Sequence, residues 1–251
     1  MIVVTGPGRA GTTFLALLYR ELGFDPGGHW RPQVRAGFED REFRRLNMAI
    51  AADLNLTVEA RSGPKSLLKL ERLRAERAEH LPDSLNSRLK RWLDAVRYRP
   101  TTLETLDWTN FDEVVACYGE QMRALAARTQ VVKDTRFNFT LYAWLASGAS
   151  IDHLVVPLRT LDSMVDSRVR VDMFSPEGRL WWKNNFAYGV GLLITAAYEY
   201  KIPLVPLRFP DFLDSPRELY TKLPLPEPRT QEEFERAFAE VYRPSLLHDR
   251  R

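Results

Sequence analysis

A glycine-rich turn near the start of the chain constrains the fold more than any other feature. Residues 2–5 (IVVT) form a short apolar run typical of a buried strand, and Gly6 to Gly11 follow with the spacing G-x-x-x-x-G. Residues 13–22 then carry apolar side chains at helical spacing, a pattern that stops at Gly23. A strand, a glycine turn and a helix in this order open an α/β domain, with the turn at the carboxyl end of the strand.

The same alternation continues along the chain. Three later apolar runs are predicted as strands: 130–133, 153–158 and 203–207. The prolines in 203–207 favour a position at the edge of the sheet. Helices are predicted between and after them: 40–53, 112–127, a helix through 142–145, one from 161, 180–200 and 231–242. We therefore predict a three-layer α/β fold, with a mostly parallel sheet of about four to five strands flanked by helices.

The length of 251 residues fits a single domain, 1–251. Residues 24–38 are rich in Pro and Gly and are predicted as a loop. The stretch of about 50–110 is predicted as a helical insertion, two amphipathic helices with a break at Pro82. The insertion is interpreted either as a lid on the acceptor side of a site or as a solvated helical face.

Composition excludes several classes of function. The single cysteine, Cys117, excludes an internal disulfide, and four scattered histidines have no metal-ligand spacing, so no metal site is predicted. The net charge of +3 is too small to indicate nucleic-acid binding. Apolar runs are too short for a membrane span, and residues 2–4 follow Met1 without a basic or extended apolar leader. These features predict a cytoplasmic protein.

The glycine turn has the chemistry of a phosphate-binding loop. Its glycines allow backbone N–H groups to face an anion, and the helix that follows adds the positive end of its dipole. In an ATP-type loop a lysine follows the second glycine, whereas this chain has Thr12 there and carries its cation at Arg9. The alternative interpretation is a glycine turn that only joins a strand to a helix.

The segment 9–15 (RAGTTFL) closely resembles the 5′-phosphosulfate loop of sulfotransferases that use PAPS (3′-phosphoadenosine 5′-phosphosulfate), especially the bacterial type. That loop usually reads Lys/Arg-Ser/Ala-Gly-Thr/Ser-Thr. The resemblance implies that Arg9 contacts the 5′-phosphate and the leaving oxygen, and that Thr12 and Thr13 donate hydrogen bonds to the same phosphate. It implies a cofactor-binding loop made of these residues: Gly8, Arg9, Ala10, Gly11, Thr12 and Thr13.

A second element of that family is an arginine at a strand end with a serine eight residues later. Arg159 follows the predicted strand 153–158, and Ser167 lies eight residues further on. The resemblance implies that this pair holds the 3′-phosphate of PAPS or of its product PAP. An arginine fork and a hydroxyl are suitable phosphate ligands, although a surface arginine and a helix serine would give the same pattern.

Looser similarity extends over other segments. Residues 131–137 are similar to a Lys-Asp-Pro-Arg segment of bacterial members, with Thr135 in place of the proline. Residues 37–43 and 207–213 are similar to a Gly-aromatic-Glu-Asp and an aromatic-Glu-Asp-Leu segment of the same family. The C-terminal glycine-rich loop of the cytosolic animal enzymes is missing from the sequence, so no adenine contacts are carried over.

The resemblance implies metal-independent sulfuryl transfer to a hydroxyl or amine. Arg9 and Lys133 are the candidates to neutralise the leaving oxygen, and Lys133 is alternatively a strand-end lysine paired with Asp134 or Glu39. Glu39 is the first candidate for the base and His29 the second, while Asp40 is interpreted as base or as cap of the next helix.

The acceptor is left open among small molecules, glycans and lipids, and so is the oligomeric state. Trp181, Trp182 and Tyr188 are interpreted either as the wall of an acceptor pocket or as core. Two other functions remain as alternatives. One is a P-loop kinase for a nucleotide or small molecule with a degenerate loop, and the other is a non-catalytic module that binds a nucleotide or nucleic acid.

Overall fold

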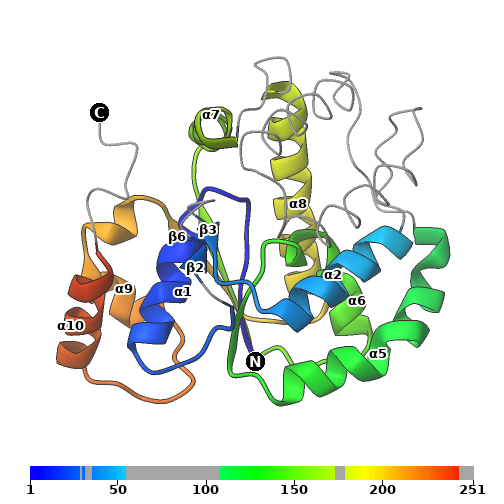
Figure 1. Ribbon diagram of the computed structural model, residues 1–251, viewed down its shortest axis with the longest axis horizontal. Helices are drawn as coiled ribbons and strands as arrows, with labels where there is room; N and C mark the ends of the chain where they lie inside the picture. The colour runs from blue at the N-terminus through cyan, green and yellow to red at the C-terminus, as the bar shows by residue number, and fades with distance from the viewer. Residues whose placement is uncertain (29, 32–35, 55–107, 173–178, 243–251) are drawn as a thin grey trace.

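Four parallel strands form the central sheet, in the order β4-β1-β5-β6 (Figure 1). The computed structural model describes residues 1–28, 30–31, 36–54, 108–172 and 179–242. The strands have these bounds: β1 (Ile2–Val4), β4 (Val131–Lys133), β5 (His153–Leu158) and β6 (Leu204–Arg208). The predicted fold class is confirmed, and within the described residues every pair of strands in this sheet is parallel.

The burial of the strands explains why apolar runs in the sequence predict their positions. All residues of β1 and β4 are buried, and so is the centre of β5, as expected for strands covered on both faces. β6 is half-exposed and lies at the edge of the sheet. Proline has no backbone N–H, and at an edge strand Pro206 can be placed without removing a hydrogen bond between strands. Pro157, in β5, lies beyond the end of its pairing with β1 at Val155.

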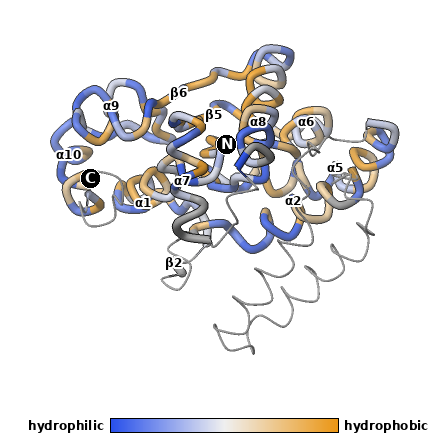
Figure 2. Tube along the Cα trace, turned by 90° about the horizontal axis from the view of Figure 1, so that it is seen from above, coloured by the Kyte–Doolittle hydropathy of each residue, from blue (hydrophilic) through white to orange (hydrophobic). Residues whose placement is uncertain are grey.

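Helices cover both faces of the sheet, which gives three layers (Figures 1 and 2). Because side chains alternate along a strand, Val4 points into one apolar core and Val3 into the other. The Val4 side is covered by α1 (Thr12–Glu21), the 3₁₀ helix η4 (Asp211–Leu213), α9 (Pro216–Lys222) and α10 (Gln231–Val241). The Val3 side is covered by α2 (Arg41–Asp53), α5 (Phe111–Ala127), α6 (Phe137–Ala146) and α8 (Arg179–Glu199).

α7 (Leu161–Asp172) has a different role, because it packs beside the glycine turn rather than on the sheet. Met164 and Val165 of α7 form a small buried cluster with Ala10 of the turn and Phe186 of α8. The helix that carries Ser167 is thereby fixed against the loop that carries Arg9.

Three parts of the chain differ from the prediction or lie beyond it, and the first is α9, at residues for which no helix is predicted. The segment 24–38, predicted as a loop, contains a two-stranded antiparallel ribbon of β2 (Trp30–Arg31) and β3 (Ala36–Gly37). Strands of two residues are too short to produce a periodic pattern. The predicted insertion lies outside the described residues, apart from its start in α2 and its end in the 3₁₀ helix η2 (Trp108–Asn110). None of the described helices has the length and apolar character needed to cross a membrane.

Candidate functional site

The candidate site lies where the four parallel strands end. The glycine turn follows β1, Asp134 follows β4, Arg159 follows β5 and Phe209 follows β6. Carboxyl ends of parallel strands meet at one edge of the sheet, so these four segments are neighbours although the sequence separates them widely. This is the edge at which ligands bind in open α/β sheets.

The glycine turn has a backbone suited to binding an anion. Gly6, Arg9 and Gly11 have positive φ values of 137°, 74° and 94°. Turns in which left-handed residues alternate with others direct successive N–H groups into one concavity. α1 starts directly after Gly11 with no side-chain cap and no acidic residue in its first turn, so no carboxylate of that turn offsets the positive end of the helix.

Arg9 is a non-glycine residue in the left-handed region, a conformation that a side chain normally avoids. Such strain persists only where the surroundings fix it, and it concentrates at functional sites. The buried Ala10 next to it packs against α7, which supplies that constraint. The strained backbone therefore holds the Arg9 guanidinium in a defined position beside the loop.

The two predicted phosphate anchors lie together. The Arg9 Nε donates a hydrogen bond of 3.2 Å to the Ser167 Oγ, across 158 positions of sequence. Ser167 is buried, with 4% of its surface exposed. A serine hydroxyl at this position is thus held inside the site by the helix and does not lie on an open helical surface.

Arg159 lies on the same rim as the glycine turn. Its guanidinium carbon is 5.4 Å from the centre of the Phe209 ring, within the range of a cation–π contact. Gly11 also lies against that ring: a Cβ there would be 2.6 Å from Cδ2 of Phe209. Phe209 therefore connects the arginine at the end of β5 to the second glycine of the turn, a role that the sequence did not indicate.

Among the glycines of the turn, Gly11 is the one whose replacement should be most damaging. Gly11→Ala places a Cβ against Phe209 and a side chain at a φ of 94°, so we expect a loss of about 2–3 kcal/mol in the free energy of unfolding. Gly8→Ala is the matched control, since nothing lies within 4 Å of its Cβ and its φ is not in the left-handed region. Urea unfolding should show Gly8→Ala within about 1 kcal/mol of the parent. Equal stability of the two variants would contradict the packing described.

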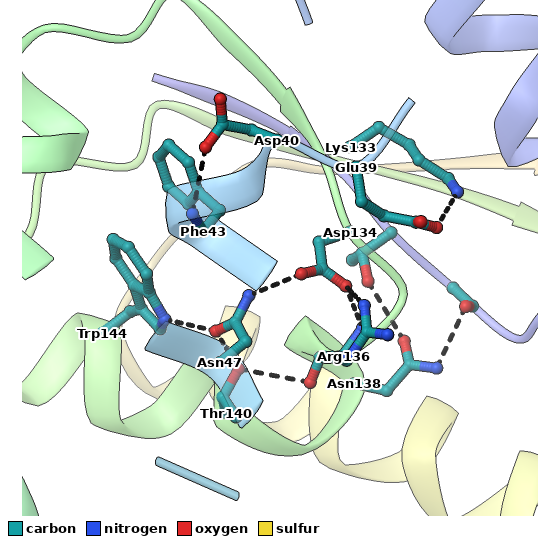
Figure 3. A network of polar contacts seen from close by, with 12 residues as sticks. Glu39, Asp40, Phe43, Asn47, Lys133, Asp134, Arg136, Asn138, Thr140 and Trp144 are labelled. Atoms are coloured by element: carbon teal, nitrogen blue, oxygen red, sulfur yellow. Dashed lines mark hydrogen bonds and ion pairs between the residues drawn. The ribbon is translucent and has the colours of Figure 1, made fainter. Parts of the chain in front are cut away.

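Lys133 and Glu39 form an ion pair beside the end of β4 (Figure 3). The Lys133 Nζ is 2.5 Å from the Glu39 Oε1, and the side chains are 3% and 21% exposed. Of the two carboxylates proposed as structural partners of this lysine, Glu39 is therefore the one it contacts. The two residues predicted as cation and base face each other, which is compatible with a structural pair and with a catalytic one.

The backbone fixes where Glu39 points. Phe38, immediately before it, is fully buried and has a φ of 64°, a rare conformation for a bulky residue. Gly28 packs so closely on this segment that a Cβ would be 2.5 Å from the Glu39 carbonyl oxygen.

Asp40 has the role of helix cap, since its Oδ1 accepts hydrogen bonds from the N–H groups of Glu42 (2.7 Å) and Phe43 (3.0 Å).

Asn138 was not predicted as a site residue, yet it connects α6 to the glycine turn. Its Nδ2 donates to the carbonyl oxygen of Gly6 at 3.0 Å, and its Oδ1 accepts from the Thr5 hydroxyl at 3.2 Å (Figure 3). All three groups are buried. The first residue of the turn is thus tied to the helix that follows β4. The only signal in the sequence is a lone amide in the apolar segment FNFTLYAWLA.

A second buried asparagine, Asn47, supports the turn after β4 (Figure 3). Its Nδ2 donates to Asp134 at 3.0 Å, and its Oδ1 accepts from the hydroxyl of Thr140 and the indole of Trp144, each at 2.8 Å. The second carboxylate oxygen of Asp134 accepts from the backbone N–H and the guanidinium of Arg136, each at 2.9 Å. Each side chain of this network therefore has a hydrogen-bond partner, and several buried bonds hold the turn that follows Lys133.

The remaining predictions have mixed outcomes. His29 and the side chain of Trp181 lie outside the described residues. Tyr188 lines an aromatic groove on the outer side of α8, whereas Trp182 packs with Phe186 near the glycine turn. In the described part of the chain, no group of His, Cys, Asp and Glu could hold a metal ion. Comparisons with protein-family models, curated proteins and solved structures found no match for this chain.

Proposed function

We propose that this chain is a sulfotransferase that moves a sulfuryl group from PAPS to a hydroxyl or amine acceptor. The observation that carries the proposal is the contact between Arg9 and Ser167, which joins the glycine turn to α7, the helix that follows β5 and Arg159. PAPS carries phosphate groups at both the 3′ and the 5′ position of its ribose, whereas ATP carries them at the 5′ position alone. A site with two separate arginines, Arg9 and Arg159, matches that pattern of charge.

The residues of the site fit such a substrate. The glycine turn and the start of α1 would receive the 5′-phosphosulfate, with Thr12 and Thr13 adding hydroxyl groups. Arg159 and Ser167 would receive the 3′-phosphate. The argument against a kinase is that Thr12 stands where an ATP-type loop has its lysine. The mild net charge of +3 gives a nucleic-acid-binding module no support.

The proposed reaction is an in-line displacement at sulfur. The acceptor oxygen forms a bond to sulfur as the bond from sulfur to the bridging phosphate oxygen breaks, and PAP leaves with that electron pair. Arg9 and Lys133 would stabilise the negative charge on the leaving oxygen. Glu39 would accept the proton of the acceptor hydroxyl, and Lys133 beside it would orient the carboxylate.

The cellular setting is part of the same proposal. Cys117 is exposed, and an unpaired thiol on the surface suits a reducing cytoplasm. We propose a cytoplasmic enzyme whose acceptor is a small molecule, a glycan or a lipid. The bacterial-type resemblance of the loop is in line with that assignment.

Glu39→Gln tests the role of the base. We expect turnover to fall by about 10²–10³-fold, because an amide cannot accept the proton, while PAP affinity stays within about threefold. The measurement is transfer of labelled sulfuryl from PAPS to a panel of sugars, phenols, lipids and water, with PAP binding followed in parallel. Asp40→Asn is the matched control, since it removes a neighbouring charge and keeps the helix cap.

Full turnover by Glu39→Gln would remove Glu39 as the base and return that role to His29. If Asp40→Asn lost as much activity as Glu39→Gln, the assignment of the base to Glu39 would fall, since local charge or Asp40 itself would explain the loss.

A further inference from the structure

A second candidate site lies on the outer side of α6 and α8, away from the sheet. It is a groove of about 560 Å³ whose described lining includes Trp108, Phe111, Tyr142, Tyr188 and Tyr200. The phosphate chemistry described above uses none of these side chains. Trp108 has 45% of its surface exposed, which is a large exposure for a tryptophan that packs against other aromatic rings.

The aromatic rings at one end of the groove stand at steep angles to one another. The planes of Trp108 and Tyr142 make an angle of 90° with their centres 5.3 Å apart. Tyr142 and Tyr200 make an angle of 76° at 6.2 Å. Rings that meet edge to face present π surfaces on adjacent walls, which is how aromatic cages surround a cationic group.

A carboxylate completes this end of the groove. Glu199, the last residue of α8, lines it and accepts a hydrogen bond of 3.0 Å from the Tyr142 hydroxyl. Glu199 is the one acidic residue among the lining residues that the structure describes, and no lysine or arginine is among them. Partial burial and the hydrogen bond to Glu199 raise the pKa of Tyr142 to about 12, so this ring stays neutral.

We propose that this groove binds an organic ammonium ion, with the cationic head against the groove-facing ring surfaces of Trp108, Tyr142 and Tyr200 and next to Glu199. Each ring attracts a cation over its π face without requiring an N–H donor, and the carboxylate supplies the opposite charge. The remainder of the groove, which includes Phe111 and Tyr188, is apolar and suits an alkyl or aryl substituent on the nitrogen.

The ammonium groove is separate from the phosphate site. α8 ends at Glu199, and β6 starts at Leu204, so the acidic end of the groove lies near the amino ends of the strands. Arg9 and Arg159 lie at the opposite edge, after the carboxyl ends of β1 and β5. The proposal therefore does not depend on sulfuryl transfer, and it can be tested without PAPS.

Choline and its neutral isostere 3,3-dimethylbutan-1-ol provide the sharpest test, because they have the same shape and differ in charge. Ligand-observed NMR on the full chain should show choline binding about fivefold more tightly or better. Glu199→Gln and Trp108→Leu should each weaken choline binding at least about threefold. Tyr198→Leu is the matched control, since this tyrosine of α8 is 87% exposed and outside the groove, and it should change nothing.

Arg9→Ala should leave choline binding intact, which separates this proposal from the phosphate site. Equal binding of the two probes, or no binding of choline, would overturn the proposal. Unchanged choline binding in Glu199→Gln and Trp108→Leu would do the same. Both positions are partly or largely exposed, so the folded state should tolerate either change, and one folded variant is sufficient for the test.

Discussion

Replacing Arg9 with glycine should lower the affinity for PAP about a hundredfold while the protein stays folded. The guanidinium is the cation of the glycine turn, and charge-assisted hydrogen bonds to a phosphate contribute about 1.5–3 kcal/mol. Glycine is the informative replacement because Arg9 has a φ of 74°, which glycine adopts without strain. Calorimetric titration with PAP measures the loss, and thermal unfolding checks that the fold remains.

Arg159→Ala should cause a similar loss, and the double variant should lose more than either single variant, since each arginine is proposed to hold a different phosphate. Arg128→Ala is the control for net charge. Arg128 is 63% exposed, pairs with Glu42 and lies before the amino end of β4, so its removal should leave PAP affinity within about twofold. PAP affinity unchanged in both single variants would remove the two-anchor argument.

Asn47→Leu should destabilise the protein by about 3 kcal/mol. Leucine has the same branched arrangement of four side-chain heavy atoms but cannot bond to Asp134, Thr140 or Trp144, and all of these bonds are buried. An indole N–H left without its acceptor and a buried carboxylate that loses a donor each cost about 1–3 kcal/mol. The free energy of unfolding in urea is the quantity to measure.

Asn184→Leu is the matched control for this change, because Asn184 is exposed on α8 and the same substitution there should stay within about 0.5 kcal/mol of the parent. If Asn47→Leu were as stable as Asn184→Leu, the hydrogen bonds around Asn47 would contribute no net stability. A loss confined to PAP binding would instead give Asn47 a direct role in the site.

Much of the fold could be predicted because buried parallel strands leave a simple signal. The bounds predicted for β5 are the ones it has in the structure. A strand that is buried on both faces needs apolar side chains at successive positions, and this gives a continuous apolar run in the sequence. The prolines of β6 located the edge of the sheet for the same physical reason. β2 and β3 were missed because two residues cannot define a period.

Site residues could be predicted where a short sequence motif carries the chemistry. They could not be predicted where the fold brings distant segments of the chain together. The sequence indicated Arg9 and Ser167 separately, and the fold brought them to 3.2 Å. Asn47 and Asn138 could not be identified from the sequence, because nothing local distinguishes a buried asparagine from an exposed one. Their hydrogen-bond partners lie 87 and 133 positions away. Phe209, between Arg159 and Gly11, was missed for the same reason.

The central claim is that two cationic anchors at the ends of neighbouring strands hold a nucleotide phosphorylated on both sides of its ribose. Its most direct test is calorimetric titration of the parent protein with PAP, adenosine 5′-monophosphate and ATP, with and without Mg²⁺. We predict that PAP binds without Mg²⁺ and at least about tenfold more tightly than the other two. Tight binding of Mg²⁺-ATP together with no response to PAP would contradict the proposed function.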